Sequence, residues 1–294
     1  MRGARVAGLV ALGLVAVGCG SGSGGGGGPS PTGGGTTASA SASRSPLTGA
    51  QASSAAAGHG WSKDRIKAAI AKHAGTTRTA KATPLNALVG AVFTHNSDGD
   101  HFCTASVVDS AGLNLIATAA HCVYDPKVGQ RGDLVFVPGY RDGDTPSGVW
   151  QLASITVDQA WADSADPDVD VAFAVVLPQN GQQVQQVLGA NKLGVNRGYT
   201  LPVKVTGYPS SGEVPITCAN QTSQQSPTQL RIDCPDYTGG TSGSPWVTDF
   251  DPQTRTGTVV GVIGGYQEGG DTPDTSYSSY FGDRVQALYA RATG

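Results

Sequence analysis

Three short segments of the chain hold the side chains that acyl-transfer chemistry requires. They are His121 in Thr-Ala-Ala-His-Cys, Asp170 in Asp-Val-Ala-Phe, and Ser242 in Gly-Gly-Thr-Ser-Gly-Ser-Pro-Trp. A serine hydroxyl is a poor nucleophile until a neutral imidazole takes its proton, and a buried carboxylate fixes the imidazole tautomer and stabilises the imidazolium that forms. The residues therefore predict a base, an orienting acid and a nucleophile in the order His121, Asp170, Ser242.

Each segment alone has an ordinary explanation, as a surface histidine, a turn aspartate or a glycine-serine loop, and only the combination favours catalysis. The aspartate must be chosen from three close neighbours, Asp166, Asp168 and Asp170. Asp170 is preferred because it directly precedes an apolar run, residues 171–176, that can hold a carboxylate away from water. Asp168 is the alternative.

The elements that must position these groups are short strands. From about residue 84, apolar runs recur between turn residues, a pattern typical of an all-β sandwich or barrel. The expected strands are 86–94, 101–108, 113–119, 133–137, 148–157, 170–177, 201–206, 215–219, 228–233, 245–248, 257–264 and 276–280. Residues 182–196 are a candidate crossover, and Phe281, Val285, Leu288 and Tyr289 share one face of a C-terminal helix.

The N-terminal part of the chain indicates export. Residues 1–18 have a charged start, an apolar run too short to span a membrane, and a small residue before Cys19, as in a secretory signal peptide. Residues 16–19, Ala-Val-Gly-Cys, resemble a bacterial lipobox, which implies a lipid on the Cys19 thiol; simple cleavage and secretion is the alternative. Residues 19–58 read as a flexible Gly/Ser/Pro/Thr-rich tether, and residues 59–83 as a helical segment, with its helix at 61–74, that is either a pro-segment or a packing element.

The composition narrows the partners. The 294 residues carry a formal net charge of −3 with 14% charged residues and no basic block, which argues against nucleic acid as a partner. Five cysteines are an odd number for an exported chain, and lipidation of Cys19 would leave an even set. Of three possible connectivities for the other four, the simplest pairs Cys103 with Cys122 and Cys218 with Cys234. A four-cysteine zinc site is disfavoured because no C-x-x-C pair exists.

The histidine and serine segments resemble those of the chymotrypsin-like (trypsin-like) serine proteases, especially the bacterial branch related to glutamyl endopeptidases. The resemblance covers about residues 84–294. It implies two six-stranded antiparallel barrels, at about 84–185 and 195–280, a C-terminal helix at 281–292, and a site in the cleft between the barrels. It also implies an oxyanion hole from the backbone N–H groups of Gly240 and Ser242, and a Cys103–Cys122 bridge that fixes the histidine loop.

The resemblance extends to specificity. The family places its pocket base six residues before the nucleophile, here Asp236, and an acid there implies selection of Arg or Lys; a turn aspartate is the equally weighted alternative. Pocket walls would come from Gly264, Gly265 and Tyr266. Ile263 stands where glutamyl endopeptidases have a histidine, which disfavours acidic substrates.

Activation is expected to differ from that of trypsin. Thr241 occupies the position of the carboxylate that receives a freed N-terminal ammonium in zymogen members of the family, and a threonine cannot form that ion pair. The site is therefore expected to form without it.

The sequence analysis therefore predicts an extracellular serine endopeptidase that acts on protein or peptide substrates as a monomer, held to the membrane only by lipid and needing no cofactor or metal. His95 and His101 flank a turn-like Asn-Ser-Asp-Gly-Asp, so we interpret them as turn neighbours rather than metal ligands. An inactive protease-fold binding module is the main alternative. An α/β-hydrolase is disfavoured because Ser244 replaces the glycine of its G-x-S-x-G elbow, and a solute-binding lipoprotein is disfavoured by the strand-rich pattern.

Overall fold

The structure, a computed structural model, describes residues 75–96 and 99–294, which belong to one compact unit, Ala56–Gly294. The expected signal peptide, the candidate lipid site Cys19, the tether and the helix at 61–74 lie outside the described residues. Among the helices that are described, none combines the length and the apolar character needed to cross a membrane.

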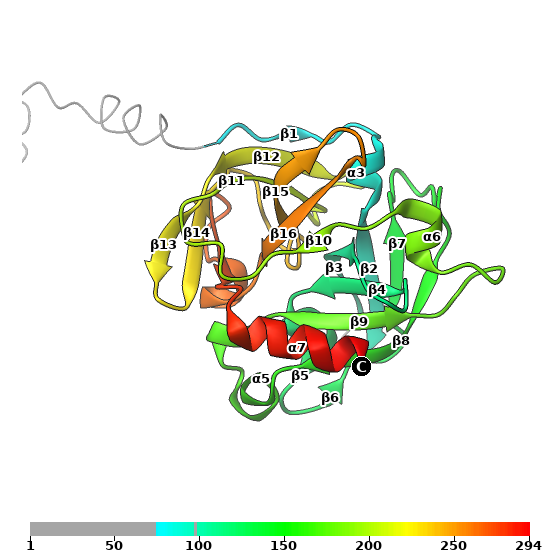
Figure 1. The fold of residues 1–294 in the computed structure, drawn as a ribbon, viewed down its shortest axis with the longest axis horizontal. Helices are drawn as coiled ribbons and strands as arrows, with labels where there is room; N and C mark the ends of the chain where they lie inside the picture. The colour runs from blue at the N-terminus through cyan, green and yellow to red at the C-terminus, as the bar shows by residue number, and fades with distance from the viewer. Residues whose placement is uncertain (1–74, 97–98) are drawn as a thin grey trace, which may run out of the picture. The chain divides into compact units, whose positions relative to one another are not determined.

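The first half is a closed six-stranded antiparallel barrel, as expected (Figure 1). Its strands, in hydrogen-bonded order, are β2 (Val89–Asn96), β3 (Gly99–Val108), β4 (Leu115–Thr118), β9 (Ala172–Val176), β8 (Trp150–Val157) and β7 (Val135–Pro138). Side chains alternate across a strand, so every second residue points into the barrel. The interior is filled by Val92, Ile116, Phe136 and Trp150, each 1% exposed or less.

The second half is built from two sheets rather than from one closed ring. The six-stranded sheet has the order β1 (Arg78–Thr79), β12 (Ile216–Gln221), β11 (Pro202–Gly207), β15 (Pro245–Asp251), β16 (Thr256–Val262) and β10 (Lys192–Leu193). The three-stranded sheet has the order β13 (Ser223–Ser226), β14 (Gln229–Asp233) and β17 (Thr275–Ser279). Trp246, Leu230 and Ile232 belong to one buried cluster that joins the two sheets. The all-β, chymotrypsin-like fold class is confirmed.

Short helices and strands connect these sheets. They are α3 (Pro84–Ala87), α4 (Ala120–Val123), β5 (Tyr124–Asp125), β6 (Gly129–Gln130), α5 (Gln159–Ser164), η1 (Pro167–Val169), α6 (Val184–Leu188) and η2 (Tyr266–Gly269). The C-terminal helix α7 (Asp283–Thr293) begins two residues later than expected and lies across β9 (Figure 1). Its apolar face, with Val285 and Leu288, packs on Phe173 of β9 in a cluster that also includes Val259 of β16. That cluster links the two halves.

Residues 75–83, which we call the N-terminal strap, are part of the folded protein. Strand β1 pairs antiparallel with β12, and the buried Ala80 donates its backbone N–H to Pro215. The backbone N–H of Gly75 donates to the carbonyl of Asp233, and the Thr77 hydroxyl donates to the carbonyl of Pro235. The strap therefore holds the start of the segment between β14 and β15 that carries Ser242, which we call the serine loop.

Both local cysteine pairings are present. The Cys103–Cys122 disulfide joins β3 to α4, and the Cys218–Cys234 disulfide joins β12 to the residue after β14. Each bridge therefore anchors a chain segment that leads to one of the three chemistry-bearing segments.

Candidate active site

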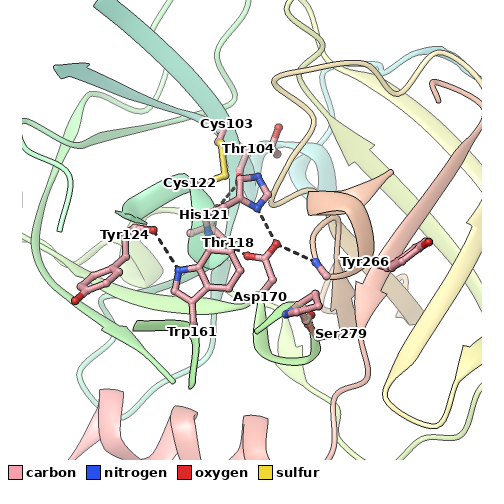
Figure 2. Close-up of polar contacts among 12 residues, drawn as sticks. Cys103, Thr104, Thr118, His121, Cys122, Tyr124, Trp161, Asp170, Tyr266 and Ser279 are labelled. Atoms are coloured by element: carbon pink, nitrogen blue, oxygen red, sulfur yellow. Dashed lines mark hydrogen bonds and ion pairs between the residues drawn. A yellow bond between two sulfur atoms is a disulfide. The ribbon is translucent and has the colours of Figure 1, made fainter. Parts of the chain in front are cut away.

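His121 lies on α4, the one-turn helix that follows β4. Strand β4 is fully buried and pairs with β3 and β9, so the position of its end is set by the barrel. The Thr118 hydroxyl donates to the carbonyl of Thr104, and the disulfide at Cys122 ties the helix to β3. The ring of His121 lies 6.4 Å, centroid to centroid, from that of Trp161 (Figure 2).

Asp170 holds the imidazole from one side. Its carboxylate is fully buried; Oδ1 accepts the backbone N–H of His121 at 3.0 Å, and Oδ2 lies 2.8 Å from Nδ1 of the same residue (Figure 2). Oδ2 also accepts the backbone N–H of Gly265 at 2.9 Å. Because an ionised carboxylate can only accept hydrogen bonds, Nδ1 carries the proton and Nε2 keeps its lone pair. This is the tautomer that a general base needs.

The two neighbouring aspartates have other partners. Asp168 accepts a hydrogen bond from the Gln229 side-chain amide at 2.8 Å, and Asp166 caps η1 by accepting the backbone N–H of Asp168 at 3.0 Å. Of the three, Asp170 is the one that contacts His121. The choice made from its place before a buried strand therefore agrees with the geometry.

Ser242 lies in a loop of tight turns that is fastened to the first barrel. The backbone N–H of Thr104 donates to the carbonyl of Ser242 at 2.7 Å, and the Thr104 hydroxyl donates to the carbonyl of Gly240 at 3.0 Å. Gly243 has φ +81°, and a Cβ there would come within 2.0 Å of the Thr104 carbonyl oxygen. Only glycine allows the loop to approach β3 this closely.

The loop leaves two backbone donors free. Within the residues that the structure describes, the backbone N–H groups of Gly240 and Ser242 donate to no acceptor. A free backbone N–H at a nucleophile and another two residues before it are groups that can receive a developing oxyanion.

Ser242 and His121 line the same cavity of about 380 Å³. In the described part of the chain the Ser242 hydroxyl forms no hydrogen bond, to His121 or to any other group. Contacts of this kind often tighten only when substrate is bound. The structure therefore places Ser242 and His121 on the wall of one cavity without a hydrogen bond between them.

The charges around His121 favour its protonated form. Burial by itself lowers the pKa of the imidazole, but the negative charge of Asp170 and its hydrogen bond to the ring outweigh burial. Glu268 raises the pKa further and Arg131 lowers it, so the pKa of His121 lies above its ordinary value of 6.5. An imidazole with this pKa is a stronger base than free histidine.

Another cavity, also of about 380 Å³, adjoins the serine loop. Its walls are residues 237–239, 241 and 242 of that loop, Ile263, residues 267–273 and Ser276. Asp236, the expected pocket base, is exposed, has φ +71° and is absent from these walls. Gly264, Gly265 and Tyr266 are absent from them as well: the two glycines pack against Asp170, and Tyr266 stacks edge-on against Tyr277.

The residues that do form the far wall follow the expected ones directly. They include Gln267, Glu268 and Asp271, which the sequence analysis did not single out. The sequence feature that could have indicated this wall is the pair Gly269-Gly270, which allows a tight turn and stands between Glu268 and Asp271. Asp236 takes the turn role that was its alternative interpretation.

One His/Cys group among the described residues has metal-like proximity. The ligand atoms of Cys103, His121 and Cys122 lie within 4.8 Å of one another. Both sulfurs belong to the disulfide and have no thiolate to offer a metal. The group is therefore part of the histidine's support.

Solved structures of serine proteases have the same fold as this chain. No protein-family model and no curated protein matches the chain. The protease Anisep from Arthrobacter nicotinovorans is 27% identical over 74% of this chain and 99% of its own, with a TM-score of 0.65. The thermostable serine protease AL20 from an extremophilic microorganism is 30% identical over 71% of this chain and 97% of its own, with a TM-score of 0.64.

A more distant structure extends the fold likeness. A Glu endopeptidase is 17% identical over 75% of this chain and 98% of its own, with a TM-score of 0.60, which bears on the fold alone. The fold and the site together define the class of chymotrypsin-like serine proteases. Given its identity with AL20 over nearly the whole of that protein, the chain belongs to this family.

Proposed function

We propose that this protein is a serine endopeptidase that hydrolyses peptide bonds through an acyl-enzyme. The observation that carries the proposal is the buried contact between Asp170 and the Nδ1 side of His121, which leaves Nε2 available as a base in the cavity that Ser242 lines. The proposed roles are general base and acid for His121, orienting carboxylate for Asp170, and nucleophile for Ser242.

In the acylation half of the proposed reaction, Nε2 of His121 takes the hydroxyl proton as Oγ of Ser242 forms a bond to the scissile carbonyl carbon. The negative charge on the carbonyl oxygen is received by the backbone N–H groups of Gly240 and Ser242. Loss of one such donor typically costs about 2.7–4 kcal/mol of transition-state stabilisation. The imidazolium then protonates the leaving amine as the carbon–nitrogen bond breaks.

In the deacylation half, water replaces the amine. Nε2 takes a proton from the water, the hydroxide attacks the ester carbon, and the imidazolium returns the proton to Ser242 as the ester bond breaks. Asp170 stays ionised throughout and stabilises the imidazolium in both halves. No step requires a cofactor.

The test is hydrolysis of a quenched-fluorescence peptide library by the purified protein beside its Ser242→Ala variant. We expect cleavage by the wild type and a loss of at least about 10³-fold in the variant. Equal, background-level rates for the two proteins would contradict the proposal and favour the inactive binding module with a protease fold.

We also propose that the protease acts outside the cell, anchored through a lipid on Cys19. The support is the signal-like sequence of residues 1–18 and the odd cysteine that remains once the two disulfides are formed. Labelling of cells with a fatty-acid analogue should mark the wild type and leave Cys19→Ala unlabelled. Release of an unlabelled wild-type protein into the medium would instead indicate simple secretion.

A further inference from the structure

The two cavities at the serine loop meet at Glu268. The first cavity is the one walled by the serine loop and residues 267–273, and the second is the one that His121 lines. Among the described residues, the two cavities share only Ser242 and Glu268. Glu268 therefore lies next to the place where a substrate would present a carbonyl to Ser242.

The first cavity is acidic. Its charged walls among the described residues are Glu268 and Asp271, and it has no lysine, arginine or histidine. Asp271 accepts a hydrogen bond from the side-chain amide of Gln267. The Glu268 carboxylate forms no hydrogen bond or ion pair within the part of the chain that the structure describes. It is the carboxylate of this cavity that is free to receive a cation.

The backbone holds Glu268 in an unusual conformation. Gln267 and Glu268 have φ values of 54° and 52°, in the left-handed region that residues with a side chain rarely adopt. Gly265 and Gly269 on either side also have positive φ, and the backbone N–H of Glu268 donates to the carbonyl of Gly265 at 2.9 Å. Two consecutive strained residues beside a nucleophile are a pattern that occurs at ligand clamps.

The field of Glu268 reaches the catalytic groups. Its charge contributes to the raised pKa of His121, which requires the carboxylate to lie within electrostatic range of the imidazole. The second cavity holds Arg131 beside Asp125 and Glu268, whereas the first holds Glu268 and Asp271 with no positive side chain to offset them. A positive substrate group is therefore attracted toward the first cavity.

Resting on the proposed protease function, we propose that Glu268 is the residue that determines primary specificity. Its carboxylate pairs with the ammonium of lysine or the guanidinium of arginine on the substrate residue that supplies the scissile carbonyl. The lysine or arginine side chain of the substrate enters the first cavity because the carbonyl of the same substrate residue is bound at Ser242, which lines both cavities. Asp236, exposed and outside both cavity walls, does not take part.

The experiment compares kcat/KM for matched peptides that carry Lys, Arg or Gln before the scissile bond, in the wild type, Glu268→Gln and Asp236→Asn. Both variants remove one negative charge without changing side-chain size, and Asn accepts the left-handed backbone of position 236. We expect Glu268→Gln to lower the Lys/Gln and Arg/Gln ratios about fivefold, as suits an exposed ion pair. Asp236→Asn should leave both ratios unchanged.

Stoichiometric reaction of Ser242 with a fluorophosphonate shows that the variant's site is folded, and the Gln peptide serves as the uncharged reference in each ratio. A fall of the ratios in Asp236→Asn alone, an equal loss for all three peptides in Glu268→Gln, or no preference for basic residues in the wild type would each overturn the inference. Failure of the proposed function itself looks different: no peptide is cleaved and the Ser242 hydroxyl does not react with a fluorophosphonate.

Discussion

Asp170 contacts His121 with both of its carboxylate oxygens: Oδ1 accepts the backbone N–H at 3.0 Å, and Oδ2 lies 2.8 Å from Nδ1 of the ring. The aspartate thus fixes the helix that carries the histidine as well as the ring itself. Because the carboxylate is fully buried, water does not compete for either contact. These two contacts set the orientation of the His121 ring.

This relationship predicts the effect of Asp170→Asn. The asparagine amide can donate to Nδ1, which moves the ring proton to Nε2 and removes the lone pair that the serine hydroxyl needs. We expect kcat to fall about 10⁴-fold with little change in KM. Steady-state kinetics measure this, with Asp168→Asn as the matched control, since Asp168 contacts Gln229 instead. Equal losses in the two variants would assign Asp170 a structural role only.

The pH dependence follows from the raised pKa of His121. The base must be neutral, so kcat/KM should rise with pH through a midpoint above 6.5. Without the negative charge of Glu268 the imidazolium of His121 is less stable, so Glu268→Gln should shift the midpoint to lower pH. A pH–rate profile of each protein measures the shift, and a midpoint that moves upward in Glu268→Gln would contradict the assigned field.

The raised pKa of His121 also affects the free energy of unfolding, which falls with rising pH where kcat/KM rises. Folding favours protonated His121, so this contribution is fully present below pH 6.5 and is lost as the pH rises through the raised value. The conditions that activate the base therefore remove some of the stability that the ion pair supplies.

The serine loop predicts an effect of Gly243→Ala. A Cβ at this position would lie 2.0 Å from the Thr104 carbonyl oxygen, and φ is +81°. We expect a loss of about 3 kcal/mol or more in unfolding free energy, together with loss of activity. Gly143→Ala is the matched control, because its φ is +84° but nothing lies within 4 Å of its Cβ. That variant should lose only about 1–2 kcal/mol. Urea denaturation of both variants makes the comparison, and similar losses would mean that the close approach to β3 is unimportant.

Much of the fold was predictable because short apolar runs between turn residues carry it. Each of the twelve expected strands overlaps a strand of the structure, from β2 to β17. Among the strands that were missed, β1 and β10 are two residues long, and each pairs with the edge of a longer strand. Tertiary pairing, and not local pattern, determines them.

Some residues of the candidate site could likewise be predicted from the sequence, and others could not. His121 and Ser242 lie in motifs whose residue order is specific, and Asp170 could be chosen because burial selects it from its neighbours. The first cavity could not be predicted, since its wall depends on consecutive left-handed residues, Gln267 and Glu268, that no propensity favours. An exposed turn at Asp236 satisfied the expected spacing without facing the cavity.

The serine loop also bears on activation. The Thr241 hydroxyl donates to the carbonyl of Thr238 at 2.7 Å, so the loop is closed by its own side chain where zymogen proteases use an ion pair. The strap contact from Gly75 to Asp233 stabilises the same region. We therefore expect a protein that keeps extra residues before Ala57 to be fully active. Peptide hydrolysis before and after N-terminal trimming measures this, and activity that appears only after trimming would contradict it.

In the proposed reaction, His121 activates the Ser242 hydroxyl. The most direct measurement is reaction with a fluorophosphonate, followed by peptide mass spectrometry to locate the adduct. We expect one adduct, on Ser242, that is absent in Ser242→Ala and forms far more slowly in His121→Ala. An adduct on another residue, or labelling that is as fast without the imidazole as with it, would show that His121 does not activate Ser242.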